Sequence, residues 1–100
     1  MIQVFKMVSG EEMIATIAGE ASDHYVLEDA VTLIYQNMQD GRMSAGFAPF
    51  MPYAEGEIKL LKTSVACVAD VKEQMVQEYT RIFSKIMVAP ATALSGLSRG

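Results

Sequence analysis

The stretch that decides the fold is residues 4–31, which read VFKMVSGEEMIATIAGEASDHYVLEDAV. It contains most of three segments rich in strand-forming residues, at 2–8, 12–18 and 25–36. A tight turn around Gly10 separates the first two segments, and Gly19 follows the second, where a strand can bend or bulge. The stretch therefore predicts three consecutive strands. In the third, apolar and polar residues do not sort cleanly between two faces, which indicates a kinked strand that changes its buried face.

The region that follows, residues 37–56, interrupts the strand pattern. Residues 37–42 form a loop with Asp40-Gly41 as its turn signal. The segment 46–53 is aromatic but holds two of the three prolines, so it predicts an edge strand or an interface loop rather than a central strand. Phe47 and Phe50 are accordingly expected at an interface between subunits. Two last strands are expected at 57–62 and 65–69, split by a turn at Thr63-Ser64.

From Asp70 the hydrophobic period becomes helical. The apolar stripe, which predicts a helix that covers the strands, consists of Val71, Met75, Tyr79, Ile82, Phe83 and Ile86. Asp70 and Glu73 have the spacing of a helix-capping pair, and Pro90 is expected to end the helix. The stripe alternatively forms a face for binding a partner.

The chain is expected to fold as one domain, because it has 100 residues, of which 51% are hydrophobic. Five short strands with tight turns favour a mainly β fold, a five-stranded bent barrel over residues 1–69. The C-terminal helix is expected to cover 70–88 and pack on the barrel, and a flexible tail is expected at 89–100.

Composition excludes several classes of function. A net charge of −4 argues against binding to duplex DNA, which depends on phosphate contacts. No apolar run is long enough to span a membrane and no signal peptide is recognisable, so a cytoplasmic protein is expected. Cys67, the single cysteine, is interpreted as a small buried hydrophobe that suits a reducing compartment. One cysteine and one histidine cannot build a zinc site within one chain, and no cofactor-binding motif is present.

Residues 4–31 resemble the first motif of the Sm-like family, which comprises the Sm, LSm and Hfq proteins. That motif combines a strand, a glycine turn, a second strand, an acidic residue and a strand ending in Asp-Ala; its counterparts here are Val4, Gly10, Ile17, Asp23, Tyr25, Leu27, Asp29 and Ala30. Residues 61–65 stand where the short second motif belongs. The chain departs from the pattern at Ala15, a glycine in the family, at His24, usually an RNA-binding asparagine, and at Lys62-Thr63, usually Arg-Gly. It also lacks the family's N-terminal helix, so it looks like a divergent and phage-encoded branch, located then in the host cytoplasm.

The resemblance implies an Sm-like, SH3-type open barrel that assembles into a homo-oligomeric ring. In such rings the fourth strand of one subunit pairs with the fifth strand of the next. That pairing would also cover the apolar edge of the last strand, which invites association when it is left open. The subunit interface is therefore expected at Val65, Ala66, Cys67 and Val68, together with Phe47 and Phe50.

The resemblance also implies binding of single-stranded RNA at the pore of the ring. His24 and Tyr25 would stack on bases, Lys62 would meet a phosphate or a base edge, and Thr63 and Ser64 would donate hydrogen bonds. The alternative interpretation is an ordinary loop histidine and a half-buried strand tyrosine. Catalysis is not expected, because Asp23 and His24 are adjacent and side chains that follow one another on a strand point to opposite faces.

A second function fits the acidic composition and the aromatic segment 46–53. It is a structural or protein-interaction ring with other proteins as partners and no nucleic-acid ligand.

Overall fold

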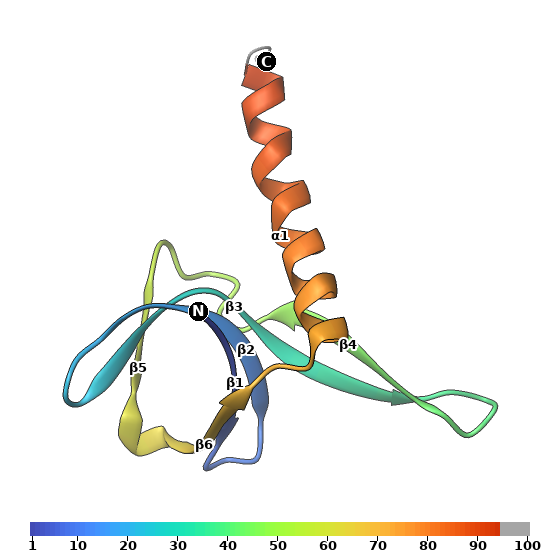
Figure 1. The fold of residues 1–100 in the computed structure, drawn as a ribbon, viewed down its shortest axis with the longest axis horizontal. Helices are drawn as coiled ribbons and strands as arrows, with labels where there is room; N and C mark the ends of the chain where they lie inside the picture. Colours follow the sequence, from blue (N-terminus) through green and yellow to red (C-terminus); the bar gives the residue numbers. More distant parts are fainter. Residues whose placement is uncertain (95–100) are drawn as a thin grey trace.

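The protein is a curved antiparallel sheet with one long helix standing on it (Figure 1). The computed structural model describes residues 1–94, with side chains through Phe83. The elements are β1 (Ile2–Met7), β2 (Glu12–Glu20), β3 (His24–Asn37), β4 (Met43–Pro49), β5 (Ile58–Leu61), the 3-10 turn η1 (Lys62–Ser64), β6 (Val65–Asp70) and α1 (Glu73–Leu94). The strands form an open six-stranded sheet in the order β4-β3-β2-β1-β6, with β5 paired to β3 off this path. A mainly β fold with a C-terminal helix is confirmed.

The two turns predicted from glycine are present. Gly10 between β1 and β2 has a φ of 100°, and Gly41 between β3 and β4 has a φ of 88°. Both values lie in the left-handed region, where a side chain is strained and glycine is favoured. At Gly19 the pairing of β2 with β3 shifts register, so the bulge expected there is also confirmed.

Strand β3 bends at Asp29, whose φ is 54°. Before the bend Leu27 packs in one hydrophobic cluster, and after it Val31 packs in another. These residues are four apart and would share a face in a straight strand. The kinked strand that changes its buried face is therefore confirmed. The bend also lets the first half of β3 pair with β5 and the second half with β4.

The sheet buries residues on both of its faces. The inner cluster lies within the curve of the sheet and contains Phe5, Met7, Met13, Ala15, Leu27 and Leu60. The outer cluster contains Ile14, Val31 and Tyr79, and it joins the sheet to α1. Because successive residues of a strand point to opposite faces, Met13 and Ile14 contribute to different clusters.

The region between the predicted motifs forms an additional strand, so the sheet has six strands rather than the five expected. Residues 43–49 make β4, which pairs with β3 at the end of the sheet order, as suits an edge strand that ends in proline. The Asp40-Gly41 turn links β3 and β4 into a hairpin that projects from the body (Figure 1). Phe47 packs against the outer cluster and Phe50 against the inner one, so both side chains contact the protein's own core.

Helix α1 differs from the prediction at both ends. It begins at Glu73 rather than Asp70, because Asp70 still belongs to β6 and accepts a hydrogen bond from Gln3 Nε2 at 2.7 Å. Asp70 is therefore not the helix cap. Pro90 does not end the helix, which continues to Leu94 through a segment rich in alanine, a strong helix former. Residues 95–100 of the expected tail lie outside the described residues.

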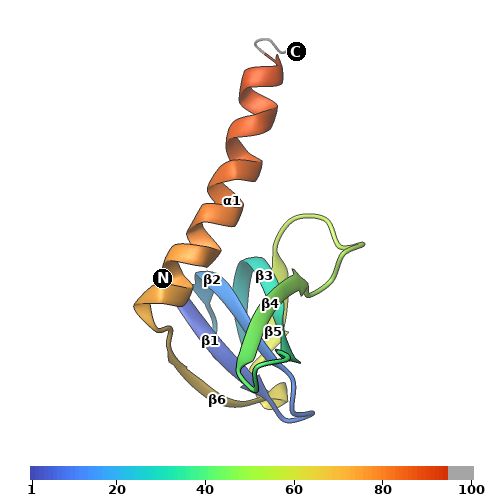
Figure 2. The same cartoon turned by 90° about the vertical axis from the view of Figure 1, so that its right-hand side faces the viewer.

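The apolar stripe covers the sheet, as expected, over the first half of the helix. Val71, Met75, Tyr79 and Phe83 pack against the outer cluster. The side chain of Ile86 lies outside the described part of the chain. Beyond Phe83 the helix leaves the sheet and projects away from it (Figures 1 and 2). Within the described residues, no helix has the length and apolar character needed to cross a membrane.

Candidate functional site

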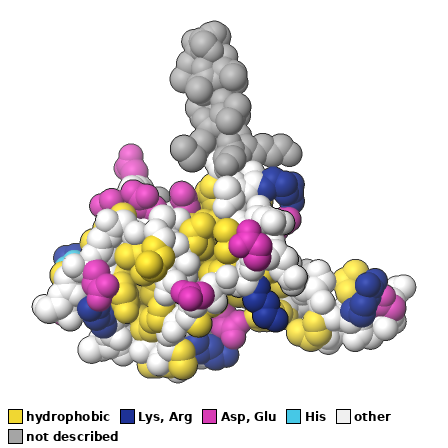
Figure 3. All heavy atoms as spheres, in the orientation of Figure 1, with side chains coloured by type: hydrophobic (Ala, Val, Ile, Leu, Met, Phe, Trp, Pro, Cys, Tyr) yellow, Lys and Arg dark blue, Asp and Glu magenta, His cyan; other side chains and the backbone are white. Residues whose placement is uncertain are grey.

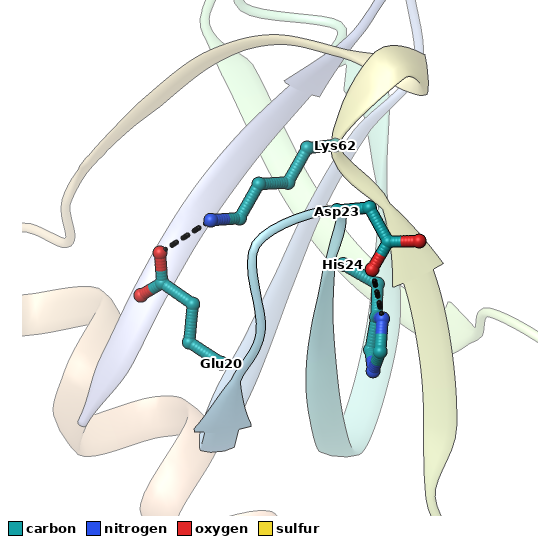
Figure 4. Close-up of polar contacts among 4 residues, drawn as sticks. All are labelled: Glu20, Asp23, His24 and Lys62. Carbon is teal, nitrogen blue, oxygen red and sulfur yellow. Dashed lines mark hydrogen bonds and ion pairs between the residues drawn. The ribbon is translucent and has the colours of Figure 1, made fainter.

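The predicted RNA-binding residues come together at one end of the sheet. His24 and Tyr25 open β3 and pair with Leu61 and Leu60 at the end of β5. The Lys62 amide donates a hydrogen bond to the Asp23 carbonyl at 2.9 Å, which joins the β2–β3 turn to η1. Figure 4 shows these two turns side by side. Residues nearly 40 positions apart in the sequence thus form one small surface.

Lys62 contacts both a carboxylate and an aromatic ring. Its Nζ lies 2.7 Å from Glu20 Oε2 and 5.1 Å from the centroid of the Tyr25 ring (Figure 4 shows the ion pair). An ammonium over a ring face is attracted by the negative π-cloud. These contacts hold the lysine across the turn, next to the two residues expected to stack on bases.

His24 is paired with its neighbour in the sequence. His24 Nδ1 lies 2.7 Å from Asp23 Oδ1, and the hydrogen bond with His24 lowers the pKa of the Asp23 carboxyl. The expectation that these adjacent side chains would point apart is wrong, because Asp23 lies in the turn before β3 and not on the strand. Asp23 orients the imidazole, whose side chain is 20% exposed.

Tyr25 is half-buried and has a structural contact. Its ring meets Phe5 edge-on with the centroids 5.4 Å apart, and it packs against the inner cluster. With Lys62 over its ring as well, little of Tyr25 is free to stack on a base. The structure thus fits the alternative interpretation of Tyr25 as a half-buried strand residue. His24 is of intermediate burial as well.

Thr63 and Ser64 complete the surface. Thr63 is exposed, whereas Ser64 is partly buried and its hydroxyl donates to the Leu61 carbonyl at 2.7 Å. The Ser64 carbonyl in turn accepts the Val8 amide at 2.9 Å. Ser64 therefore shapes the turn, and Thr63 has the hydroxyl that a ligand would reach.

Sequence reasoning missed Glu20 as part of this site. Its ion pair with Lys62 spans 42 positions, and only the pairing of strands brings the two together. The carboxylates of Glu20 and Asp23 stand beside Lys62 and His24, so the site has no net positive charge when His24 is neutral. Such a surface suits hydrogen bonding to the edges of bases better than attraction of phosphates.

The predicted interface residues of the last strand lie on an open edge. Strand β6 pairs with β1 and ends the sheet order, while β4 ends it on the other side. Ala66, Cys67 and Val68 are exposed, and Val65 packs against the inner cluster. The interpretation of Cys67 as a buried residue is wrong, because no element of the described chain covers this part of the outer face.

The described residues contain no group of three or more histidine, cysteine, aspartate or glutamate side chains arranged to hold a metal ion. Comparison with models of known protein families and with curated proteins gives no match.

Proposed function

We propose that the protein is a ring-forming, Sm-like binder of single-stranded RNA. The observation that carries the proposal is that His24, at the start of β3, lies next to the turn that holds Lys62 and Thr63, and these are the positions that the resemblance to the two Sm-like motifs assigns to RNA. Spacing in the sequence alone does not require these turns to meet. The histidine ring would stack on a base, and the ammonium and hydroxyl would hydrogen-bond to its edge.

The two open edges of the sheet support the assembly. Strand β6 lies at the end of the sheet order with Val68 39% exposed, and β5, the fourth of the five expected strands, has β3 as its paired neighbour among the described residues. Pairing of these edges between copies would satisfy their backbone groups, and a closed ring would leave neither edge open. A ring repeats each weak site around one axis, so several modest contacts act on one RNA strand.

The charge of the site, two carboxylates beside one lysine, leads to a specific expectation about salt. A binder that neutralises many phosphates loses affinity steeply with salt, whereas one that reads base edges loses little. Because Lys62 is paired with Glu20, we expect binding with a shallow salt dependence and a preference between base sequences. Fluorescence anisotropy with short U-rich and A-rich RNA at several salt concentrations measures both.

The test compares H24A and K62A with the matched control K72A, which removes an exposed lysine at the foot of α1. Binding by the native chain and K72A, with loss in both site variants, is the expected result. Equal affinity in all four proteins, or no binding even at low salt, contradicts RNA recognition at this site.

A second candidate is a ring that binds proteins and no nucleic acid. It is favoured by the carboxylates of Glu20 and Asp23 at the site and by the full exposure of Tyr53 in the loop before β5. Affinity capture from a lysate, with and without RNase, separates the two. Partners that survive RNase support this candidate, and partners that all disappear support RNA binding.

A further inference from the structure

The ion pair between Glu20 and Lys62 is open to solvent at the end of the sheet. Glu20 closes β2 and Lys62 opens η1, and their side chains are 54% and 31% exposed. Lys62 Nζ donates to Glu20 Oε2 at 2.7 Å, and the other carboxylate oxygen accepts no hydrogen bond from the described residues. The pair therefore presents a hydrogen-bond acceptor and a hydrogen-bond donor side by side on one surface.

Contacts with the core hold this pair in place. Glu20 is the cross-strand partner of Tyr25, so the two side chains share a face of the sheet. Lys62 Nζ lies 5.1 Å from the centroid of the Tyr25 ring, which itself packs edge-on against buried Phe5. In Figure 3 the histidine lies at the left edge of the body, with basic and acidic side chains near it in that view. Polar groups that are already held in place lose little conformational freedom when a ligand binds.

The donors and acceptors on the Watson–Crick edge of each base determine which base suits such a pair. Guanine has two neighbouring donors on this edge, N1–H and the 2-amino group, beside the acceptor O6. Uracil has one donor between two acceptors, and adenine and cytosine each place an amino group beside a ring-nitrogen acceptor. A carboxylate can accept two parallel hydrogen bonds, and an ammonium beside it can donate a third. Guanine is therefore the base whose edge complements a carboxylate next to a lysine.

We infer that the Glu20–Lys62 pair selects guanine in single-stranded RNA. The Glu20 carboxylate would accept hydrogen bonds from N1–H and the 2-amino group, and Lys62 Nζ would donate to O6. Any other base would direct a carbonyl or ring-nitrogen acceptor at the carboxylate, and two facing acceptors leave a hydrogen bond unmade. The inference rests on the proposed function and adds the base that the site reads.

Modified bases test the contact in the native protein. The probe is a short oligouridylate that carries guanosine at regular intervals, compared by fluorescence anisotropy with the same strand carrying inosine or adenosine. Inosine lacks only the 2-amino donor of guanine, so we expect it to bind about tenfold more weakly, and adenosine likewise. The control is 7-deazaguanosine, which keeps the Watson–Crick edge and should bind as tightly as guanosine. Equal affinity for the guanosine and inosine strands would overturn the inference.

The variant E20Q tests which residue reads the base. An amide has one acceptor oxygen, so it cannot accept both guanine donors in parallel as a carboxylate can. We expect the preference for guanosine over inosine to disappear, whereas the affinity for plain oligouridylate should not fall, because E20Q also releases Lys62 from its ion pair. A loss of folding would instead weaken the binding of every strand, and circular dichroism checks for it.

The matched control is E55Q. It removes the same charge from an exposed side chain in the loop before β5, whereas Lys62 follows the other end of that strand. E55Q should keep the preference for guanosine. A preference that persists in folded E20Q, or that disappears in both variants, would overturn the assignment to Glu20.

Guanosine monophosphate separates a free nucleotide from a base within a strand, because it presents the same edge alone. A strand can occupy several copies of the site in a ring, so we expect the monophosphate to displace labelled RNA at least about tenfold less effectively than the unlabelled guanosine strand. Equally effective displacement would assign the site to a free nucleotide and overturn recognition within RNA.

The same measurements separate this inference from the proposed function. Binding of all the RNA strands with equal affinity overturns the selection of guanine and leaves RNA binding standing. Absence of binding to any strand, even at low salt, overturns both. A preference for guanosine that E20Q removes and E55Q keeps supports both.

Discussion

One hydroxyl links three parts of the molecule. Tyr79 on α1 is only 2% exposed, and its OH donates to the Asp29 carbonyl at 2.8 Å and lies 3.0 Å from Thr16 Oγ1. Burial raises the pKa of Tyr79, so the hydroxyl stays protonated and remains a donor. The helix is thus fixed directly to the bend in β3.

Replacing that hydroxyl tests its contribution. Y79F keeps the ring but leaves the Asp29 carbonyl without this partner, so we expect the free energy of unfolding to fall by about 1–2 kcal/mol. Urea unfolding followed by circular dichroism measures the change. Y53F removes the same group from a fully exposed side chain and should leave stability unchanged. Equal stability of Y79F and the native protein would argue against the link.

Asp29 itself gives a prediction that depends on pH. Burial, and then repulsion from Glu28, raises the pKa of its carboxyl above the ordinary value of 3.8. The folded state therefore holds this proton more tightly than the unfolded state, and the ionised group destabilises the fold above its folded pKa. D29N removes that charge, and because Asp29 is exposed we expect only a small gain in the free energy of unfolding at pH 7.

The gain in D29N should vanish below pH 3.8, where Asp29 is protonated in both states. D29A separates the effect of the charge on stability from the effect of the backbone conformation. Both variants remove the charge, but alanine tolerates a φ of 54° poorly, whereas asparagine tolerates it well. We expect D29A to lose about 1 kcal/mol at neutral pH. Denaturation curves for both variants at several pH values measure these differences. An advantage of D29N that persists at low pH would contradict the electrostatic cause.

At the scale of elements, the β3–β4 hairpin depends on one glycine. Gly41 has a φ of 88° with open space around it, so the backbone angle alone disfavours a side chain there. G41A is expected to destabilise the protein by about 1 kcal/mol. G46A is the matched control on the same hairpin, because Gly46 lacks a positive φ and a Cβ there meets only the Ile34 carbonyl, at 4.0 Å. Thermal unfolding measures the stability of both variants. Equal destabilisation by G41A and G46A would contradict the explanation that the positive φ of Gly41 disfavours a side chain.

Most elements could be predicted from the sequence, because their signals are local. The turns at Gly10 and Gly41, the bend in β3 and the covering stripe of α1 each follow from the pattern of neighbouring residues. Strand β4 could not be assigned securely, because its prolines and aromatic residues suited either an edge strand or a loop. Only pairing with β3, which no local pattern encodes, distinguishes the two.

In the candidate site, too, local sequence patterns predict individual residues but not the contacts between distant parts of the chain. His24, Lys62 and Thr63 could be selected from motif positions, but their partners could not. The pairing of Lys62 with Glu20 depends on how distant turns meet, and the exposure of Cys67 depends on which part of the sheet α1 leaves uncovered. The hydrophobic composition around Cys67 correctly indicated a strand but wrongly indicated burial, since β6 lies at the end of the sheet order and its cysteine is exposed.

At the scale of the whole molecule, assembly is the property on which the proposed site depends. Val68 lies on the open edge of β6, whereas Val8 lies in the turn after β1, and both are exposed valines. Lysine on an edge strand discourages pairing with another chain, because the charge would have to be desolvated in the contact. If the proposed ring forms, we therefore expect V68K to be monomeric at micromolar concentration and V8K to remain oligomeric. Native mass spectrometry measures the oligomeric state of V68K and V8K, and circular dichroism checks that each variant is folded. Because Val68 lies outside the proposed RNA site, loss of RNA binding in a folded, monomeric V68K would show that this site acts only when several copies share one axis. An unchanged oligomer in V68K would instead place the contact between subunits away from this edge.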